Sequence, residues 1–308
     1  MKFSVVTCCY NQGQYLAANI EAVLAQDYPD FEHIIVDDGS TDNTRSVCRR
    51  YRHVRYVYQR NAGQSAALNR GFAEADGDVI AWVNSDDYHE PGAFWRVARE
   101  MAGPGRPDIV AGMAKVVNAE RGFMWMLKNG PVPFLRLLFH PRLYRAGGRT
   151  AMPCQPSVFF RRSVRERLGW LETDLRYGMD YEYWLRAMTR GYGFQYVPQV
   201  FSSYRYHASS HTCELGYDAF LGEWAEVSQR YLGQLSPLRR ALAECWWQLS
   251  KVETWLWTRH QRGAELLMRR RTQQGPLSLV ARALCQAPWL AAGLAARALG
   301  RRRTGERC

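Results

Sequence analysis

Residues 3–42 read FSVVTCCYNQGQYLAANIEAVLAQDYPDFEHIIVDDGSTD, in which two apolar runs flank an amphipathic segment. The runs Phe3–Thr7 and Glu32–Asp37 have the length and composition of buried strands. Between them, apolar residues recur at helical spacing from Leu16 to Leu24. Two strands joined by such a helix pair in parallel, because a parallel pair needs a long crossover connection. The stretch therefore predicts an α/β fold.

The same alternation continues through residue 87. Residues 54–58 and 79–83 are predicted as strands, and residues 41–51 and 64–75 as helices. Three of the four strands run into polar clusters, and ligands of parallel sheets bind beyond the carboxyl ends of the strands. Solvated loops would explain one such cluster more easily than three, so a ligand site is expected there. The clusters are Thr7–Asn11, Asp37–Asp42 and Asn84–Asp87.

Beyond residue 108 the pattern is less regular. Strands are expected at residues 109–117 and 158–160 and a short helix at 180–190, whereas residues 120–150 suggest a flap or an acceptor-facing segment. After residue 213 the pattern changes to long helices rich in Trp, Leu and Arg. We predict an α/β domain over residues 1–212, with a mostly parallel sheet flanked by helices, and a basic helical extension over residues 213–308.

The composition restricts the class of protein. A chain of 308 residues with 47% hydrophobic residues forms a packed core, and its formal charge of +12 favours an anionic partner. The eight cysteines lack zinc-type spacing and are expected to be reduced thiols in the cytosol. Because we find neither a secretory signal nor an uncharged stretch of about 20 residues, we expect a cytoplasmic protein that is soluble or lies on a membrane.

Adjacent carboxylates follow the predicted strand 79–83. Asp86 and Asp87 repel each other unless a cation or hydrogen bonds offset their charges. Mg²⁺ and Mn²⁺ prefer oxygen ligands and commonly combine one or two carboxylates with substrate phosphates. In the preceding cluster, Gly39 allows a close backbone approach, and Ser40 or Thr41 is placed to cap the next helix. An exposed Asp-Asp turn and a helix cap without a ligand are the alternatives.

Four sequence blocks resemble the family 2 glycosyltransferases in their order and spacing. They are Val5–Asn11, Val36–Asp42, Asn61–Gly71 and Asn84–Asp87. The resemblance continues through residues 154–162 and 177–186 to 204–207, and it covers residues 1–212 but not 213–308. It implies the GT-A fold and transfer of a sugar from a nucleotide diphosphate donor, UDP- or dTDP-linked, to a hydroxyl of a cell-surface glycan or glycolipid.

The resemblance also implies roles for single residues. Asp38 matches the carboxylate that reads the base, Asp87 is the first choice for the metal, and Asn84 stands where many relatives have Asp. The expected nucleotide-binding residues are Thr7, Tyr10, Asn11, Asp38, Gly39, Asn61, Gln64, Ser65, Asn84, Asp86 and Arg205. The expected ligands of a divalent Mg²⁺ or Mn²⁺ ion are Asp87, Asp86 and His207.

Asp180 matches the catalytic base of the family, although Met179 replaces the acidic residue that usually precedes it. A carboxylate in reach of the acceptor hydroxyl removes its proton, which implies a metal-assisted single displacement with inversion. Glu182 is the second candidate for the base, and a helix N-cap is the alternative role of Asp180. Gln155, Glu182 and Trp184 are the expected acceptor residues.

Several alternatives compete with a transferase. A nucleotidyltransferase is disfavoured, because it would need a glycine-rich turn with basic residues after the first strand. A nucleic-acid partner is disfavoured, because clustered carboxylates repel a phosphate backbone. A processive synthase is disfavoured as well, because it would need membrane-spanning helices and a Gln-x-x-Arg-Trp motif. A non-catalytic relative that binds nucleotide sugars stays open.

The C-terminal helices have two interpretations. They combine tryptophans such as Trp246 and Trp255 with the arginine runs 269–271 and 301–303 around the apolar segment 276–299. Such helices either lie on an anionic bilayer, which would suit a lipid-linked acceptor, or cap the core.

Overall fold

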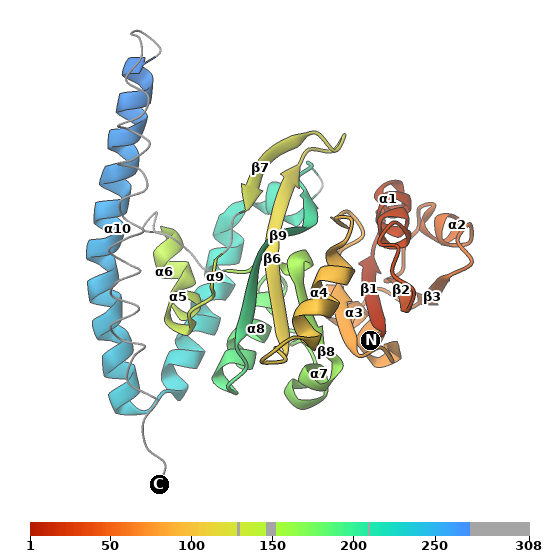
Figure 1. Ribbon diagram of the computed structural model, residues 1–308, viewed down its shortest axis with the longest axis horizontal. Coiled ribbons are helices and arrows are strands. Elements are labelled where there is room, and N and C mark those ends of the chain that lie inside the picture. The colour runs from red at the N-terminus through yellow and green to blue at the C-terminus, as the bar shows by residue number, and fades with distance from the viewer. Residues whose placement is uncertain (128–129, 146–151, 209, 272–308) are drawn as a thin grey trace. The chain divides into compact units, whose positions relative to one another are not determined.

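The computed structural model describes residues 1–127, 130–145, 152–208 and 210–271. Its sheet has nine strands in the order β3-β2-β1-β4-β8-β6-β9-β5, with β7 added beside β6 (Figure 1). The strands are β1 (Phe3–Cys9), β2 (Phe31–Asp37), β3 (Val54–Tyr58), β4 (Val79–Trp82), β5 (Tyr88–His89), β6 (Ile109–Val117), β7 (Phe123–Leu127), β8 (Val158–Arg161) and β9 (Phe194–Arg205).

Helices alternate with these strands in the first hundred residues and dominate after residue 205. They are α1 (Gly13–Leu24), α2 (Thr44–Cys48), α3 (Gln64–Glu74), α4 (Ala93–Ala102), α5 (Phe134–Leu138), α6 (His140–Arg145), α7 (Arg162–Leu168), α8 (Met179–Thr189), α9 (His211–Gln234) and α10 (Pro237–Arg271), with a short 3₁₀ helix at Gln155–Ser157. The chain divides into two compact units, Met1–Thr254 and Trp255–Cys308. The first unit thus extends past residue 212 and includes α9.

The amino-terminal half of the sheet is parallel, as the sequence predicts. Strand β1 pairs in parallel with β2 and β4, so that Val6 lies between Ile34 and Trp82. Strand β3 pairs in parallel with β2, and β9 with β6, whereas β8 runs antiparallel between β4 and β6. The expected α/β fold with a mostly parallel sheet is therefore confirmed. The reversed strand β8 brings β6 and β9 beside the parallel set, and β5 and β7 run antiparallel to β9 and β6.

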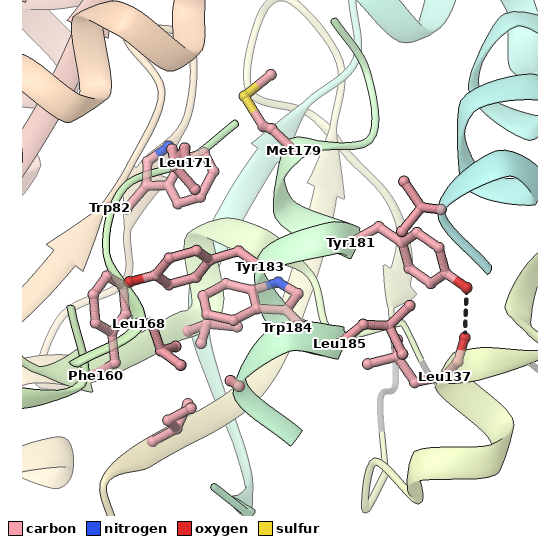
Figure 2. Packing of buried hydrophobic residues seen from close by; sticks show 14 of the residues in the cluster. Trp82, Leu137, Phe160, Leu168, Leu171, Met179, Tyr181, Tyr183, Trp184 and Leu185 are labelled. Atoms are coloured by element: carbon pink, nitrogen blue, oxygen red, sulfur yellow. Dashed lines mark hydrogen bonds between the residues drawn. The ribbon is translucent and has the colours of Figure 1, made fainter. Parts of the chain in front are cut away.

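Alternate residues of each strand enter cores on opposite faces of the sheet. Val5 and Phe159 pack against α4, whose Phe94 and Val97 are fully buried. Val6, Trp82 and Phe160 belong to the larger cluster on the other face, which α3, α8 and α9 complete (Figure 2). Because both faces of the central strands are covered, β1 and β4 are buried along their whole length.

Residues 120–150 do not behave as one segment. Phe123 and Trp125 on the edge strand β7 are exposed, whereas Leu137, Leu138 and Phe139 are fully buried in the larger cluster. The expectation of a flap is therefore wrong for residues 137–139, because their apolar side chains complete the core. Residues 128–129 and 146–151 lie outside the described part of the chain.

The long helices predicted after residue 213 are present. Within the first unit, Trp224 and Tyr231 of α9 are buried, and the rings of Trp246 and Trp247 stack on Phe139 at 5.8 and 5.6 Å. This packing is the cap on the core that was one of the two interpretations. None of the helices in the described ranges is long and apolar enough to cross a membrane. The segment 276–299 and the arginines 301–303 lie outside those ranges.

Candidate active site

The polar clusters that follow β1, β2 and β4 meet at one edge of the sheet. The backbone N–H of Asn11 donates to Oγ of Ser40 at 2.9 Å, and the N–H of Thr41 donates to Oδ1 of Asn11 at 2.8 Å. The amide of Gln12, the residue directly after the first cluster, lies 3.5 Å from Oδ2 of Asp86 in the third. The convergence predicted from strand ends is therefore confirmed.

The loop after β2 has a close backbone approach at Gly39. Its φ of +85° is in the left-handed region, and a Cβ there would lie 2.8 Å from the backbone N of Asn61. The helix cap differs from the prediction, since α2 begins at Thr44 and Oδ1 of Asp42 accepts its N–H at 2.9 Å. Ser40 and Thr41 are therefore not the capping residues, because each hydrogen-bonds to Asn11 instead.

Asp38 is buried and orders the loop that leads to α3. Its Oδ1 accepts hydrogen bonds from the Gln59 amide (2.7 Å) and the Ala62 N–H (2.9 Å), and its Oδ2 accepts one from the Gly63 N–H (2.9 Å). A carboxylate with three donors of this kind is fixed in place. Recognition of a base by Asp38 stays a prediction.

The other expected nucleotide residues differ in exposure. Tyr10, Asn11 and Asn61 are exposed, with Tyr10 at 51%, so a ring and two amides are accessible at this edge. Gln64 donates to Oδ1 of Asn84 at 3.0 Å. The Thr7 side chain is fully buried and lies 3.1 Å from Nε2 of His33, so the structure does not bring it to the site surface.

The side chain of Asp87 is buried beside the backbone of Arg205. Asp87 is 1% exposed, and its Oδ1 accepts the backbone N–H of Arg205 at 2.9 Å. Burial, and next the charge of Asp86, raises the pKa of Asp87 well above its ordinary value. The amide of Asn19 supports the turn by donating to the carbonyl oxygens of Asn84 (3.0 Å) and Asp87 (2.9 Å).

His207 extends from the end of β9 to the same place. Its Nε2 lies 3.1 Å from Oδ2 of Asp86, and its ring packs on Tyr15 with centroids 4.5 Å apart. Carboxylate oxygens suit Mg²⁺ and Mn²⁺, and an imidazole nitrogen is a common ligand of metal ions. Among the described residues, no group of three or more His, Cys, Asp or Glu side chains is arranged to hold a metal ion. The donor set thus fits an ion that takes two protein ligands and completes its shell with phosphate oxygens.

Arg205 supplies unused donors beside the carboxylates. The residue is buried, and its guanidinium carbon lies 4.6 Å from the centre of the Tyr15 ring and 5.8 Å from that of Tyr88. Burial, and next the charge of Arg121, lowers its pKa. Its Nε and Nη2 have no hydrogen-bond partner within the described part of the chain. Buried donors without a partner are costly, and a diphosphate is the kind of anion that would satisfy them.

Asp180 is the second residue of α8 and is partly exposed. Its Oδ1 accepts the N–H of the next residue, Tyr181, at 2.7 Å, and because Gly178 is the N-cap residue of α8, Asp180 is not the helix cap. Burial raises the pKa of Asp180 to about 6, which is suitable for a base at neutral pH. Burial also raises the pKa of the Cys154 thiol, with smaller effects from the charges of Asp87 and Asp180. Cys154 is therefore within electrostatic reach of both carboxylates.

Two of the three expected acceptor residues belong to the core. Trp184 is fully buried against Trp82 and Phe160 (Figure 2). Glu182 is fully buried as well, and it binds Arg186 (2.7 Å) and the Tyr231 hydroxyl (2.6 Å). An acceptor cannot contact side chains without exposed surface, so the predicted acceptor roles of Trp184 and Glu182 are wrong, as is that of Glu182 as base.

Gln155 also has a structural contact, since its amide donates to the carbonyl of Trp82 at 2.6 Å. Its remaining exposure is small, and an acceptor role stays a prediction.

Sequence reasoning missed Asn19, Tyr15 and Tyr88. Asn19 had a detectable signal, because it is a polar residue on the buried stripe formed by Leu16, Ile20 and Val23 of α1. Tyr15 and Tyr88 had no detectable signal, since their rings contact Arg205, which is distant from both in the sequence.

A family model and several curated proteins match the chain in sequence. The family model of Glycosyl transferase family 2 matches residues 4–169, more than half of the chain. An uncharacterised glycosyltransferase of Nostoc sp. is 42% identical over 102 residues, which are 32% of each chain. The glycosyltransferase GlyG of Streptococcus pneumoniae is 44% identical over 89 residues, 27% of this chain and 30% of GlyG. The chain thus matches about a third or less of the length of these curated relatives.

Solved structures resemble the fold. TarS of S. aureus in complex with UDP-GlcNAc has a TM-score of 0.62 at 20% identity, over 79% of this chain and 69% of that chain. The mannosyltransferase PcManGT of Pyrobaculum calidifontis, in complex with GDP-Man and Mn²⁺, has a TM-score of 0.54 at 21% identity, over 97% and 81%. At these identities the likeness is one of fold.

Proposed function

Since the chain belongs to glycosyltransferase family 2, we propose that it transfers a sugar from a UDP- or dTDP-linked donor to a hydroxyl group of a cell-surface glycan or glycolipid. The observation that carries the proposal is the meeting of strand ends at Asp86, where Gln12, directly after the first cluster, and His207 converge. TarS and PcManGT, which share the fold, were solved with nucleotide sugars. Convergent polar groups at this edge of a parallel sheet are where such a ligand binds.

Donor binding is assigned to residues at the two sides of Asp86. The exposed ring of Tyr10 can stack on the base, while the partnerless Nε and Nη2 of Arg205 suit the oxygens of a diphosphate. Loop 59–63, which Asp38 orders, would form the floor of the base pocket.

A divalent cation fits best between Asp86 and His207. This modifies the expectation that Asp87 is the main ligand, because both Asp87 oxygens already lie beside Arg205 and Asn84 at 2.9 and 3.4 Å. When bound, the ion would offset the charge that develops on the departing diphosphate. Buried Asp87 would then act by holding the Arg205 backbone in place.

Asp180 is assigned as the general base. With a pKa of about 6, its carboxylate is mostly ionised at neutral pH and can take the proton of the acceptor hydroxyl. The oxygen so activated attacks the anomeric carbon as the diphosphate leaves, and one displacement inverts that centre. The carboxylate is oriented by the Tyr181 N–H.

We further propose that α10 lies on an anionic membrane at the cytoplasmic face, where a lipid-linked acceptor would be found. Four apolar side chains of α10 in the first unit are 58–71% exposed, namely Leu238, Leu242, Leu249 and Val252. Arg239, Arg240 and Lys251 are exposed along the same stretch. Apolar and basic groups in one helix are typical of helices that lie in the interface.

Co-sedimentation with vesicles tests the membrane proposal. Wild type should sediment with phosphatidylglycerol vesicles at low salt, and the variant Leu238→Ser/Leu242→Ser/Leu249→Ser should stay in the supernatant. Equal behaviour of the two proteins would exclude α10 as the binding surface.

Equilibrium binding tests the donor proposal. UDP, dTDP and GDP are titrated into the protein with Mn²⁺, Mg²⁺ or EDTA, and metal-dependent binding of one nucleotide is expected. A protein that binds a nucleotide but transfers no sugar would be a non-catalytic relative, an alternative that Asn84 and the two-ligand metal site keep open.

A further inference from the structure

Helix α8 begins without a capping side chain of its own. Gly178 is the N-cap residue, and it has no side chain with which to accept a hydrogen bond from the first turn. The segment that enters the helix, Arg176–Gly178, is instead bound by Glu223 of α9. Its Oε1 accepts the N–H of Arg176 at 2.8 Å, and its Oε2 accepts the N–H groups of Tyr177 and Gly178, each at 2.7 Å.

These three bonds use both oxygens of the Glu223 carboxylate. Hydrogen bonds from backbone N–H groups to an ionised carboxylate are about twice as strong as bonds between neutral groups. The approach is close, because a Cβ at Gly178 would lie 3.4 Å from Oε2 of Glu223 and 3.3 Å from Cδ1 of Trp224. The rings of Tyr177 and Phe220 add a contact at 5.0 Å. One face of α9 thus fixes the entry to α8.

Two more contacts hold the first turn of α8 on other sides. The hydroxyl of Ser65, at the start of α3, donates to Sδ of Met179 at 3.1 Å. The hydroxyl of Tyr181 donates to the carbonyl oxygen of Leu137 at 3.0 Å (Figure 2) and also to that of Leu138 at 3.0 Å. Asp180 lies between Met179 and Tyr181, so its position follows from contacts with α3, α5 and α9 together.

We propose that Glu223 is a positioning residue for Asp180, holding the backbone that carries the base within reach of the acceptor hydroxyl. The inference rests on the proposed function of Asp180. Glu223 is suited to this role because its three hydrogen bonds end two to four residues before Asp180. Release of this segment would let the first turn of α8 move, and a displacement of about 1 Å at a reacting group can lower the rate about 100-fold.

The substitution Glu223→Gln tests the proposal with little change in volume. Glutamine keeps one carbonyl oxygen but turns an amide donor toward backbone N–H groups, which breaks one side of the contact. Glu226→Gln is the matched control, because Glu226 is exposed on the same helix three residues later. Transfer is measured with the donor identified by titration, well below the midpoint of thermal unfolding of each protein.

We expect Glu223→Gln to lower kcat at least tenfold with the donor KM changed less than about twofold, while Glu226→Gln matches wild type. Glu223→Asp keeps the charge and should recover part of the lost kcat. In an Asp180→Asn background, Glu223→Gln should cause no further loss, because a residue that acts through the base has no effect once the base is gone.

Three results would overturn the inference. The first is a kcat of Glu223→Gln equal to that of the control, and the second is a lower unfolding midpoint with no change in kcat. The third is a decrease in kcat caused by Glu223→Gln that is as large in the Asp180→Asn background as in wild type. Failure of the proposed function is distinguishable, since Asp180→Asn would then transfer at the wild-type rate by itself. An inactive Asp180→Asn beside a normal Glu223→Gln would remove only the role of Glu223.

Discussion

Nε2 of His207 lies 3.1 Å from Oδ2 of Asp86, although the two residues are 121 positions apart in the chain. The contact exists because β9 runs parallel to β6 and ends beside the turn that follows β4. It joins the two parts of the sheet at the point where the polar clusters meet. The donor site therefore depends on the carboxyl-terminal end of β9 as much as on the first ninety residues.

Removal of the imidazole should weaken metal binding. In His207→Ala, Mn²⁺ affinity measured with saturating nucleotide is expected to fall at least about tenfold, since even groups behind the ligands contribute that much. Asp86→Asn should behave in the same way. Titration calorimetry with Mn²⁺ checks both variants, and wild-type affinity in His207→Ala would exclude the imidazole as a ligand.

Activity should depend on pH through Asp180. Burial raises the pKa of this carboxyl to about 6, so kcat should fall about tenfold per unit as the pH drops below 6 and should be level above it. Asp180→Asn should remove this dependence together with most of the activity. A wild-type profile that stays level down to pH 4.5 would contradict the assignment.

The raised pKa of Asp180 also affects stability, which should decrease with rising pH where activity increases. Because the pKa of Asp180 is higher in the folded protein than in the unfolded chain, its contribution to stability is present below about pH 4 and is lost as the pH rises through about 6. At pH 8, the neutral Asp180→Asn variant should therefore unfold at a higher urea concentration than wild type. A lower midpoint would show that ionised Asp180 stabilises the fold.

Trp184 should affect stability and not the site. It is fully buried, so Trp184→Ala is expected to lower the free energy of unfolding by about 3–5 kcal/mol. Donor affinity per folded molecule should stay within about twofold of wild type. Urea unfolding and nucleotide titration check the two statements, and Trp184→Phe supplies a milder variant. A stable Trp184→Phe with a large increase in acceptor KM would restore the acceptor role.

Much of the fold could be predicted from the sequence because local patterns determine it. The predicted bounds of β3 and β6 agree with the structure, and α8 begins within one residue of the prediction. Strand ends also indicated where the clusters converge, since parallel strands end at one edge. The helix α2 is shorter than predicted, since it begins at Thr44, whose N–H donates to Asp42, and ends at Cys48.

The misassigned residues share a physical reason. Glu182 and Trp184 are on the same short helix as Asp180, and only the tertiary packing of α8 decides which of them retains exposed surface. Leu137 and Phe139 look like a surface flap in sequence, yet α9 and α10 cover them. Glu223 gave no signal, because its partners lie 45–47 residues earlier in the chain.

Buried histidines should make the protein sensitive to acid. Burial lowers the pKa of His33 and His89 to about 3 and that of His140 to about 4. Each stays neutral in the folded protein while the unfolded chain binds a proton below about pH 6.5, so stability should fall as the pH falls from 6.5 towards 3.

His89→Phe tests this linkage. The His89 ring lies 5.3 Å from that of Phe94 and 5.2 Å from that of Phe159, so a phenyl ring suits its surroundings. Between about pH 5.5 and 4, the slope of unfolding free energy against pH should decrease by about 1.4 kcal/mol per unit. Urea unfolding at several pH values measures it, and an unchanged slope would mean that His89 is protonated in the folded state.

The most direct test of a donor site at Asp86 is nucleotide release from a panel of UDP-, dTDP- and GDP-linked sugars, in wild type and in Asp86→Ala. We expect that one donor class is turned over, that Mn²⁺ or Mg²⁺ is required, and that Asp86→Ala loses the activity while keeping its unfolding midpoint near that of wild type. Turnover unaffected by EDTA and by Asp86→Ala would contradict the assignment of the site at the strand ends.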